Sequence, residues 1–290
     1  MSASTVTVSE LIAWKLDEYP YRDFGTNLGK EELSDKLVLA RRTLIERASY
    51  EPFSAVLDLE TAHIQHLLDV HAQRTEVEQE YVGLDWTLGV VDLRRLLAFQ
   101  RRLVFDPELQ LLQIPHPNDW PALLSLSFGS ARSTTYKMKV HEIDGHLSGL
   151  TLQSRNPDFQ LRPPHNSELH GSLPLSLFGG SPFFEVAQFR GRWFLRDGYH
   201  RAYRLLQAGV HHLPAVVIHA RTIDEVGATQ PWFFGEEELF SSRPPRVVDF
   251  LEDAVMLSYK RPRLVKTIAI RVEESLEEFR ETGEVQGDEQ

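Results

Sequence analysis

Side chains able to bind an anion or to transfer a proton are concentrated between positions 197 and 204. A glycine directly before a helix lets the backbone turn tightly and directs the first N–H groups, with the positive end of the helix dipole, outward. An arginine can donate two parallel hydrogen bonds to a phosphate, and a histidine can donate from a ring nitrogen. The segment therefore predicts an anion site. Its predicted ligand-binding residues are Gly198, Tyr199, His200, Arg201 and Arg204.

The catalytic candidates in this segment are Asp197, His200 and Arg201. In an enzyme, the histidine and the arginine would stabilise phosphate charge, and the aspartate would orient a group or help to hold Mg²⁺. That chemistry is phosphoryl transfer or nucleotide hydrolysis, and spacing alone identifies no carboxylate base and no metal ligands. A plainer interpretation remains open, in which Asp197 caps the helix and Arg204 is a solvated surface charge.

Net charge supports a small anionic ligand more than a nucleic acid. The 290 residues carry 31 Lys+Arg and 42 Asp+Glu, a formal charge of −11, which argues against coating of DNA. Residues 1–85 and 222–290 are each net −8, whereas residues 186–221 hold six arginines against one acid. The acidic flanks suggest a protein partner as a further possibility.

Missing residue types and motifs exclude other classes. With no cysteine, thiol nucleophiles, thiolate metal sites and disulfides are ruled out. The P-loop, zinc-protease and serine-hydrolase motifs are absent as well. Residues 1–8 lack the basic start of a secretory signal, and no apolar stretch is long enough to span a bilayer. We expect a cytoplasmic protein without membrane contact.

The elements that must position the site are a hairpin, a helix and a strand. Residues 184–189 and 193–195 are two strand-like runs separated by a short glycine turn, which predicts a β-hairpin. The helix is predicted over 199–208, with Gly209 as its stop, and a buried strand over 214–219. Elsewhere the patterns predict helices over 10–16, 30–48, 61–80, 247–257 and 273–280, strands over 86–93 and 265–272, a hairpin pairing 136–140 with 147–152, and a disordered end over 281–290. If the chain is an interaction protein, we expect Trp232, Phe233 and Phe234 to form an exposed aromatic patch.

This hairpin–glycine–helix–glycine–strand run resembles the ParB/sulfiredoxin-like superfamily. The residues that carry the resemblance are Pro182 to Val186, Gly191 to Leu195, Asp197 to Arg201, Gly209 and Leu213 to Ile218. The resemblance implies that Gly198, His200 and Arg201 cradle the phosphates of a nucleotide (ATP, ADP, CTP or GTP, with Mg²⁺ possible). It also implies that Gln100 and Arg102 form the facing wall. Sulfiredoxins place their catalytic cysteine where this chain has Tyr199, so sulfiredoxin chemistry is excluded.

We therefore expect an α+β protein with three segments. These are a helical segment over 1–85, a ParB/sulfiredoxin-like domain over 86–221 with an irregular insertion at about 106–181, and an acidic α/β extension over 222–290. The expected function is binding of a nucleotide or another phosphorylated small ligand at residues 197–201. The alternatives are a non-catalytic regulatory or interaction protein, and a nuclease or DNA-modification accessory, which a steep salt dependence of DNA binding would reveal.

Overall fold

The structure is a computed structural model that describes residues 5–14, 30–57, 62–107, 113–129, 135–156, 159–162, 176–229 and 233–275. It mixes helices with several sheets, so the α+β prediction is confirmed at that level. Two compact units divide the chain: residues 1–133 with 180–264, and residues 134–179 with 265–290. This grouping differs from the three predicted segments, because strands from all three pair in one sheet of the first unit.

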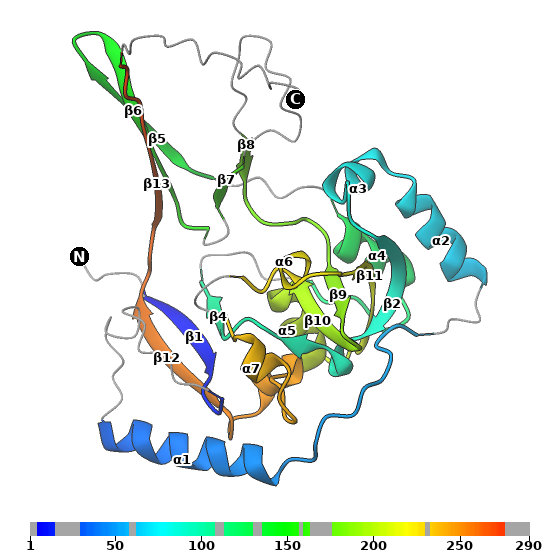
Figure 1. The fold of residues 1–290 in the computed structure, drawn as a ribbon. Coiled ribbons are helices and arrows are strands. Elements are labelled where there is room, and N and C mark those ends of the chain that lie inside the picture. The colour runs from blue at the N-terminus through cyan, green and yellow to red at the C-terminus, as the bar shows by residue number, and fades with distance from the viewer. Residues whose placement is uncertain are drawn as a thin grey trace, which may run out of the picture. The chain divides into compact units, whose positions relative to one another are not determined.

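That sheet has the order β12-β1-β4, and its strands are β1 (Thr5–Leu11), β4 (Arg102–Phe105) and β12 (Met256–Pro262). Helix α1 (Lys30–Glu46) covers one face, where Leu33, Leu37 and Leu44 pack against buried residues that include Val6 and Val8 (Figure 1). The helix predicted over 30–48 is confirmed. The helix predicted over 10–16 is wrong for residues 10–14, because the preceding Thr-Val alternation extends a strand to Leu11.

A five-stranded sheet forms the centre of the first unit. Its order is β2-β11-β9-β10-β3, with β2 (Trp86–Asp92) and β3 (Leu97–Ala98) at the edges. Strands β9 (Glu185–Phe189) and β10 (Arg192–Asp197) form the predicted hairpin, and β11 (His212–His219) lies parallel to β9. The predicted strands over 86–93 and 214–219 are confirmed.

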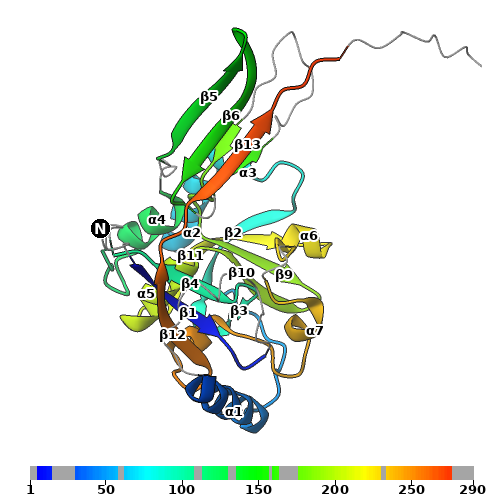
Figure 2. The ribbon, with the colours of Figure 1, turned by 90° about the vertical axis from the view of Figure 1, so that its left-hand side faces the viewer.

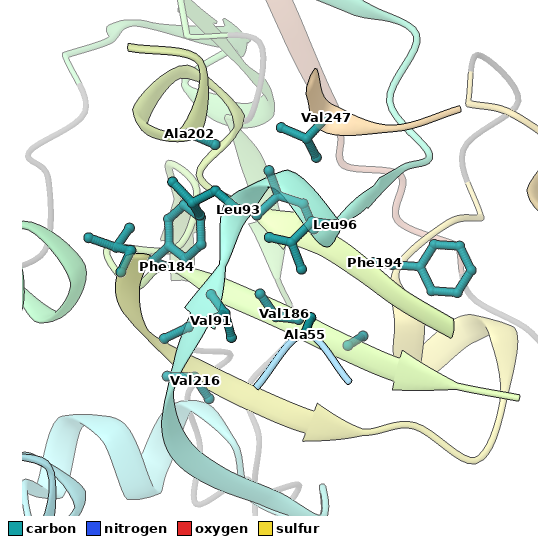
Figure 3. Packing of buried hydrophobic residues seen from close by; sticks show 14 of the residues in the cluster. Ala55, Val91, Leu93, Leu96, Phe184, Val186, Phe194, Ala202, Val216 and Val247 are labelled. Carbon is teal, nitrogen blue, oxygen red and sulfur yellow. The ribbon is translucent and has the colours of Figure 1, made fainter. Parts of the chain in front are cut away.

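Helix α5 (Tyr199–Gln207) follows β10 directly, as predicted, and Gly209 at φ 75° follows its end. Figure 3 shows the core beside this helix, with the ring of Phe184 next to the helical turn that carries Ala202. Val91, Val186 and Val216 line the sheet in the same cluster, and all are fully buried. The core therefore fixes where the β10–α5 corner lies.

The remaining helices of the first unit are short and flank these sheets. One helix predicted over 61–80 is in fact two, broken at residues 73–74. The helix predicted over 247–257 is wrong: five residues form a 3-10 turn, after which Leu257 and Tyr259 alternate as buried residues of β12. These elements are α2 (Ala62–Ala72), α3 (Thr75–Glu80), η2 (Leu93–Arg95), α4 (Trp120–Phe128), α6 (Ile223–Val226), α7 (Glu236–Leu239) and η3 (Val247–Leu251).

The predicted aromatic patch at 232–234 is wrong as an exposed surface. Phe234 is 1% exposed, and Phe233 is half-buried with its ring centroid 4.9 Å from that of Phe99. Trp232 lies outside the described residues. The two described phenylalanines belong to the core of the first unit or pack against it.

The second unit contains a three-stranded sheet of order β13-β6-β5 and a small ribbon of β7 and β8. The predicted hairpin is confirmed as β5 (Lys137–Ile143) and β6 (His146–Ser154), with Asp144 at φ 51° in its turn. The strand predicted over 265–272 is confirmed as β13 (Lys266–Arg271) (Figure 2). The ribbon pairs β7 (Gln160–Arg162) with β8 (Ser176–Phe178).

Two further predictions concern the C-terminal end and membrane contact. The helix predicted over 273–280 is wrong for residues 273–275, which are not helical, and residues 276–290 lie outside the described part. Among the helices that the structure describes, none has both the length and the apolar character needed to cross a bilayer.

Candidate functional site

Gly198 occupies a position that only glycine can fill without strain. Its φ of 103° lies in the left-handed region, and a Cβ built there would lie 2.4 Å from a ring carbon of Phe184. The glycine therefore brings the start of α5 into direct contact with the core aromatic ring. Close packing explains this residue without a ligand.

Arg201 crosslinks three segments of the first unit from inside the protein. The residue is 4% exposed, and its Nη1 donates to the carbonyl oxygens of Leu126 (3.1 Å) and Pro182 (2.9 Å). Its Nη2 donates to the carbonyl oxygen of Phe183 (2.5 Å) and approaches Oδ1 of Asp197 at 3.4 Å. These bonds direct the guanidinium toward backbone carbonyls, so ligand binding by Arg201 stays a prediction that its contacts disfavour.

Tyr199 anchors the opposite side of the α5 start. Its hydroxyl oxygen accepts hydrogen bonds from the backbone N–H groups of Phe99 (3.0 Å) and Gln100 (3.2 Å). Burial raises the pKa of this hydroxyl, and the two N–H donors lower it by a smaller amount. The tyrosine thus holds residues 99–100 against the helix as a neutral acceptor.

His200 and Arg204 lie on the outer side of α5, next to Phe105 of β4. The Nε2 of His200 donates to the carbonyl oxygen of Val104 (2.9 Å), and its ring meets Phe105 edge-on at 5.4 Å. The guanidinium carbon of Arg204 lies 5.7 Å from the same phenylalanine ring. His200 is exposed and Arg204 is half-exposed. Of the predicted site residues on α5, these two are on the accessible side.

Gln100 and Arg102 point to different neighbours. The Nε2 of Gln100 donates to the carbonyl oxygen of Arg102 (2.9 Å), which keeps this side chain close to its own loop. The Nη2 of Arg102 donates to Oε1 of Glu10 (2.9 Å), and the hydroxyl of Tyr259 donates to Oε2 of the same carboxylate (3.0 Å). Arg102 therefore belongs to a buried charge network of the β12-β1-β4 sheet, whereas Gln100 stays beside Tyr199.

Three acids of the first unit, Glu185, Asp92 and Asp197, are each paired with an arginine. Glu185 is 3% exposed and accepts from Tyr81 (2.7 Å) and from Arg196 (2.6 Å). Burial raises the pKa of Asp92, but the hydrogen bonds from Arg94 outweigh burial and leave this pKa below its usual value. Asp197, with a side chain about one-third exposed, is the acid that retains the most contact with solvent.

An open pocket of about 480 Å³ lies beside the outer side of α5. Cross-strand pairing places Thr7 between Lys260 and Phe105, so the three side chains share one face of the β12-β1-β4 sheet. That face is the one opposite α1, and Arg204 reaches the pocket from α5. The lining residues are Thr5, Thr7, Phe105, Asp106, Pro107, Arg204 and Lys260.

Electrostatics in this pocket favour an anion. Asp106 is held by Nη2 of Arg263 at 2.5 Å, and both of these side chains are nearly buried. Within the described part of the chain, no carboxylate pairs with Arg204 or Lys260. The pocket therefore presents two cations and two hydroxyls, with its acid already neutralised.

Of the residues that line the pocket, only Arg204 is predicted from the sequence as a ligand-binding residue. Lys260 comes from a strand whose start was predicted as a helix, and Thr5 and Thr7 come from a strand that was not predicted. The Thr-Val-Thr-Val run over 5–8 was the available signal, because strict alternation is typical of a half-buried strand.

The described residues hold no group of three or more His, Asp or Glu side chains placed to bind a metal ion. No family model, curated protein or solved structure matches the chain.

Proposed function

We propose that the protein binds a phosphorylated small ligand in the pocket beside α5, with Arg204 and Lys260 as the phosphate-binding cations. The observation that carries the proposal is their convergence on one open pocket whose acid, Asp106, is already bonded to Arg263. A pocket of this size falls within the range of small-molecule sites, roughly 300–1,000 Å³.

The lining residues match both the phosphate groups of such a ligand and its sugar or base. Arg204 offers a planar fork and Lys260 a compact charge, which together match the oxygens of a phosphate or diphosphate. The hydroxyls of Thr5 and Thr7 add uncharged donors on the sheet side. Phe105 contributes an apolar wall against which a sugar or base can pack.

The resemblance to the ParB/sulfiredoxin-like superfamily supports a nucleotide as the first ligand to test. The order β9, β10, α5, β11 agrees with the hairpin–helix–strand order on which that resemblance rests. In this proposal Gly198, Tyr199 and Arg201 are positioning residues that fix α5, and Arg204 contacts the ligand. The motif at the start of α5 then supports binding indirectly, because it fixes the orientation of the helix face that carries Arg204.

Binding is the function that these residues support, and phosphoryl transfer is the step beyond it. If the bound nucleotide is also turned over, Asp197 is the acid closest to α5 that retains solvent contact, and Mg²⁺ would have to accompany the nucleotide. His200, whose ring nitrogen donates to the Val104 carbonyl, would keep its place beside the pocket wall.

A ligand panel tests the proposal. The protein is heated with ATP, ADP, CTP, GTP or inorganic pyrophosphate, each with and without Mg²⁺, and the unfolding temperature is recorded. A ligand that binds the native state raises this temperature. We expect a rise with at least one member, which Arg204→Gln and Lys260→Gln both remove. The proposal is rejected if no member raises it, or if both variants respond like the wild type.

A further inference from the structure

Strand β5 forms one edge of the three-stranded sheet in the second unit. The sheet order is β13-β6-β5, so among the described strands β5 pairs with β6 alone. The outer side of an edge strand presents every second backbone N–H and C=O group without a strand partner. Such an edge can accept one more strand by backbone hydrogen bonding.

Over residues 137–141, before the register shift at Glu142, the side chains of β5 divide by chemistry between the two faces of this sheet. Register places Met138 beside Leu152 and Ile268, and Val140 beside Leu150 and Ile270, so this face is apolar across all three strands. Lys137, Lys139 and His141 point to the other face, where their neighbours are polar or small: Gln153, Thr151 and Gly149 on β6, and Thr267, Ala269 and Arg271 on β13.

The side chains of the apolar face are most exposed on the β5 side of the sheet. Met138 is 61% exposed and Val140 is 46% exposed, whereas Leu152 on the central strand is 3% exposed. Ile268 and Ile270 on the other edge are half-buried. The apolar surface that lacks cover is therefore the part next to the free edge, where an added strand would supply the missing neighbours.

Charge on β5 distinguishes between possible occupants. In a symmetric antiparallel pair of two copies, equivalent faces must coincide, so the registers centred on Met138 or Lys139 set lysine directly against lysine. Like charges directly opposite each other destabilise a strand pair, and edge lysines are a known device against such pairing. A second copy of this chain therefore fits the edge poorly.

We propose that β5 is a docking edge for an extended segment of another protein in which acidic and apolar residues alternate. Its apolar side chains would cover Met138 and Val140, and its carboxylates would lie opposite Lys137 and Lys139. Backbone hydrogen bonds would supply the affinity and the alternation would supply the specificity. The interaction is independent of the pocket in the first unit.

A synthetic peptide tests the edge directly. The probe is a fluorescent peptide of about eight residues in which glutamate and valine alternate, and two controls replace glutamate by lysine or gather the glutamates into one block. We expect the full-length protein to bind the alternating acidic peptide and neither control. The double variant Lys137→Glu with Lys139→Glu should weaken binding about tenfold or more.

A control variant on β13 and hydrogen exchange distinguish binding at the β5 edge from other modes of binding. Arg271→Glu reverses a cation on the same face but on β13, two strands away, and should leave the affinity unchanged. Hydrogen exchange should show new protection at alternate amides of β5 when the peptide is bound. The proposal is overturned by absence of binding up to about 1 mM peptide, by equal binding of the block peptide, by an Arg271→Glu effect as large as that of the double variant, or by a β5-dependent dimer of the protein itself.

Discussion

The guanidinium of Arg201 in α5 donates a 2.9 Å hydrogen bond to the carbonyl oxygen of Pro182, nineteen residues earlier in the chain. The same side chain also reaches the carbonyls of Leu126 and Phe183, so one arginine joins α5, the end of α4 and the entry to β9. Without it, one buried and two partly buried carbonyls would lose a charged donor. This crosslink explains why an arginine stands at this position even before a ligand is considered.

Loss of Arg201 should destabilise the fold, whereas loss of Arg204 should not. We expect Arg201→Gln to lower the free energy of unfolding by about 3 kcal/mol or more, because one buried and two partly buried carbonyls lose their charged donor. Arg204→Gln removes a half-exposed charge and should cost less than about 1 kcal/mol. Urea unfolding of both variants measures the difference, and equal losses would contradict the assigned roles.

Gly198 should tolerate no side chain. In Gly198→Ala the new Cβ would meet the Phe184 ring and also occupy a left-handed φ, so we expect a loss of about 3 kcal/mol or more in unfolding free energy. Gly191→Ala is the matched control, since its φ of 74° is similar but nothing lies within 4 Å of a Cβ there. That control should lose only about 1 kcal/mol from backbone strain. Similar losses in the two variants would show that the Phe184 contact is unimportant.

Local patterns predicted the elements around α5 well. The hairpin, the glycine before the helix and the buried strand β11 follow from alternation, turn residues and an apolar run, which are short-range signals. The pairing of β1 with β4 and β12 joins residues far apart in the chain, and such pairing leaves no local pattern. The same holds for the pocket residues. The motif at the start of α5 predicts Arg204, whereas Lys260 is brought into the same pocket only by the pairing of β12 with β1.

The burial of Tyr259 should make stability depend on alkaline pH. Burial, with the nearby Glu10 carboxylate, raises the pKa of this hydroxyl from 10.0 to about 12. The unfolded chain therefore loses this proton first as the pH rises above 10, and the stability that the neutral hydroxyl contributes is lost as the pH approaches 12. Between pH 10 and pH 12 the unfolding free energy of Tyr259→Phe should therefore fall by about 2 kcal/mol less than that of the wild type.

Unfolding free energies of the two proteins at pH 8, 9, 10, 11 and 12 give the comparison. Buried Tyr81 and Tyr199 titrate in both proteins, so they cancel in the difference between them. Parallel curves for the wild type and Tyr259→Phe would contradict the buried position of this hydroxyl.

Glu185 should be a strong determinant of stability because its carboxylate is buried with Tyr81 and Arg196. Glu185→Gln leaves Arg196 beside a neutral group, and we expect a loss of about 3 kcal/mol in unfolding free energy. Glu236→Gln breaks an exposed ion pair with Arg190 and should cost less than about 1 kcal/mol. A small effect at Glu185 would mean that water reaches this pair.

Side-chain NMR can show whether Arg204 contacts the ligand while Arg201 holds the fold. The Nε–Hε resonances of the arginines are followed during a titration with the nucleotide or pyrophosphate that gives the largest thermal shift, and Arg204→Gln identifies the Arg204 signal. We predict that the Arg204 resonance moves in a saturable way while the Arg201 resonance stays in place. Movement of the Arg201 resonance with Arg204 unaffected would show instead that the ligand binds at the loop of residues 197–201.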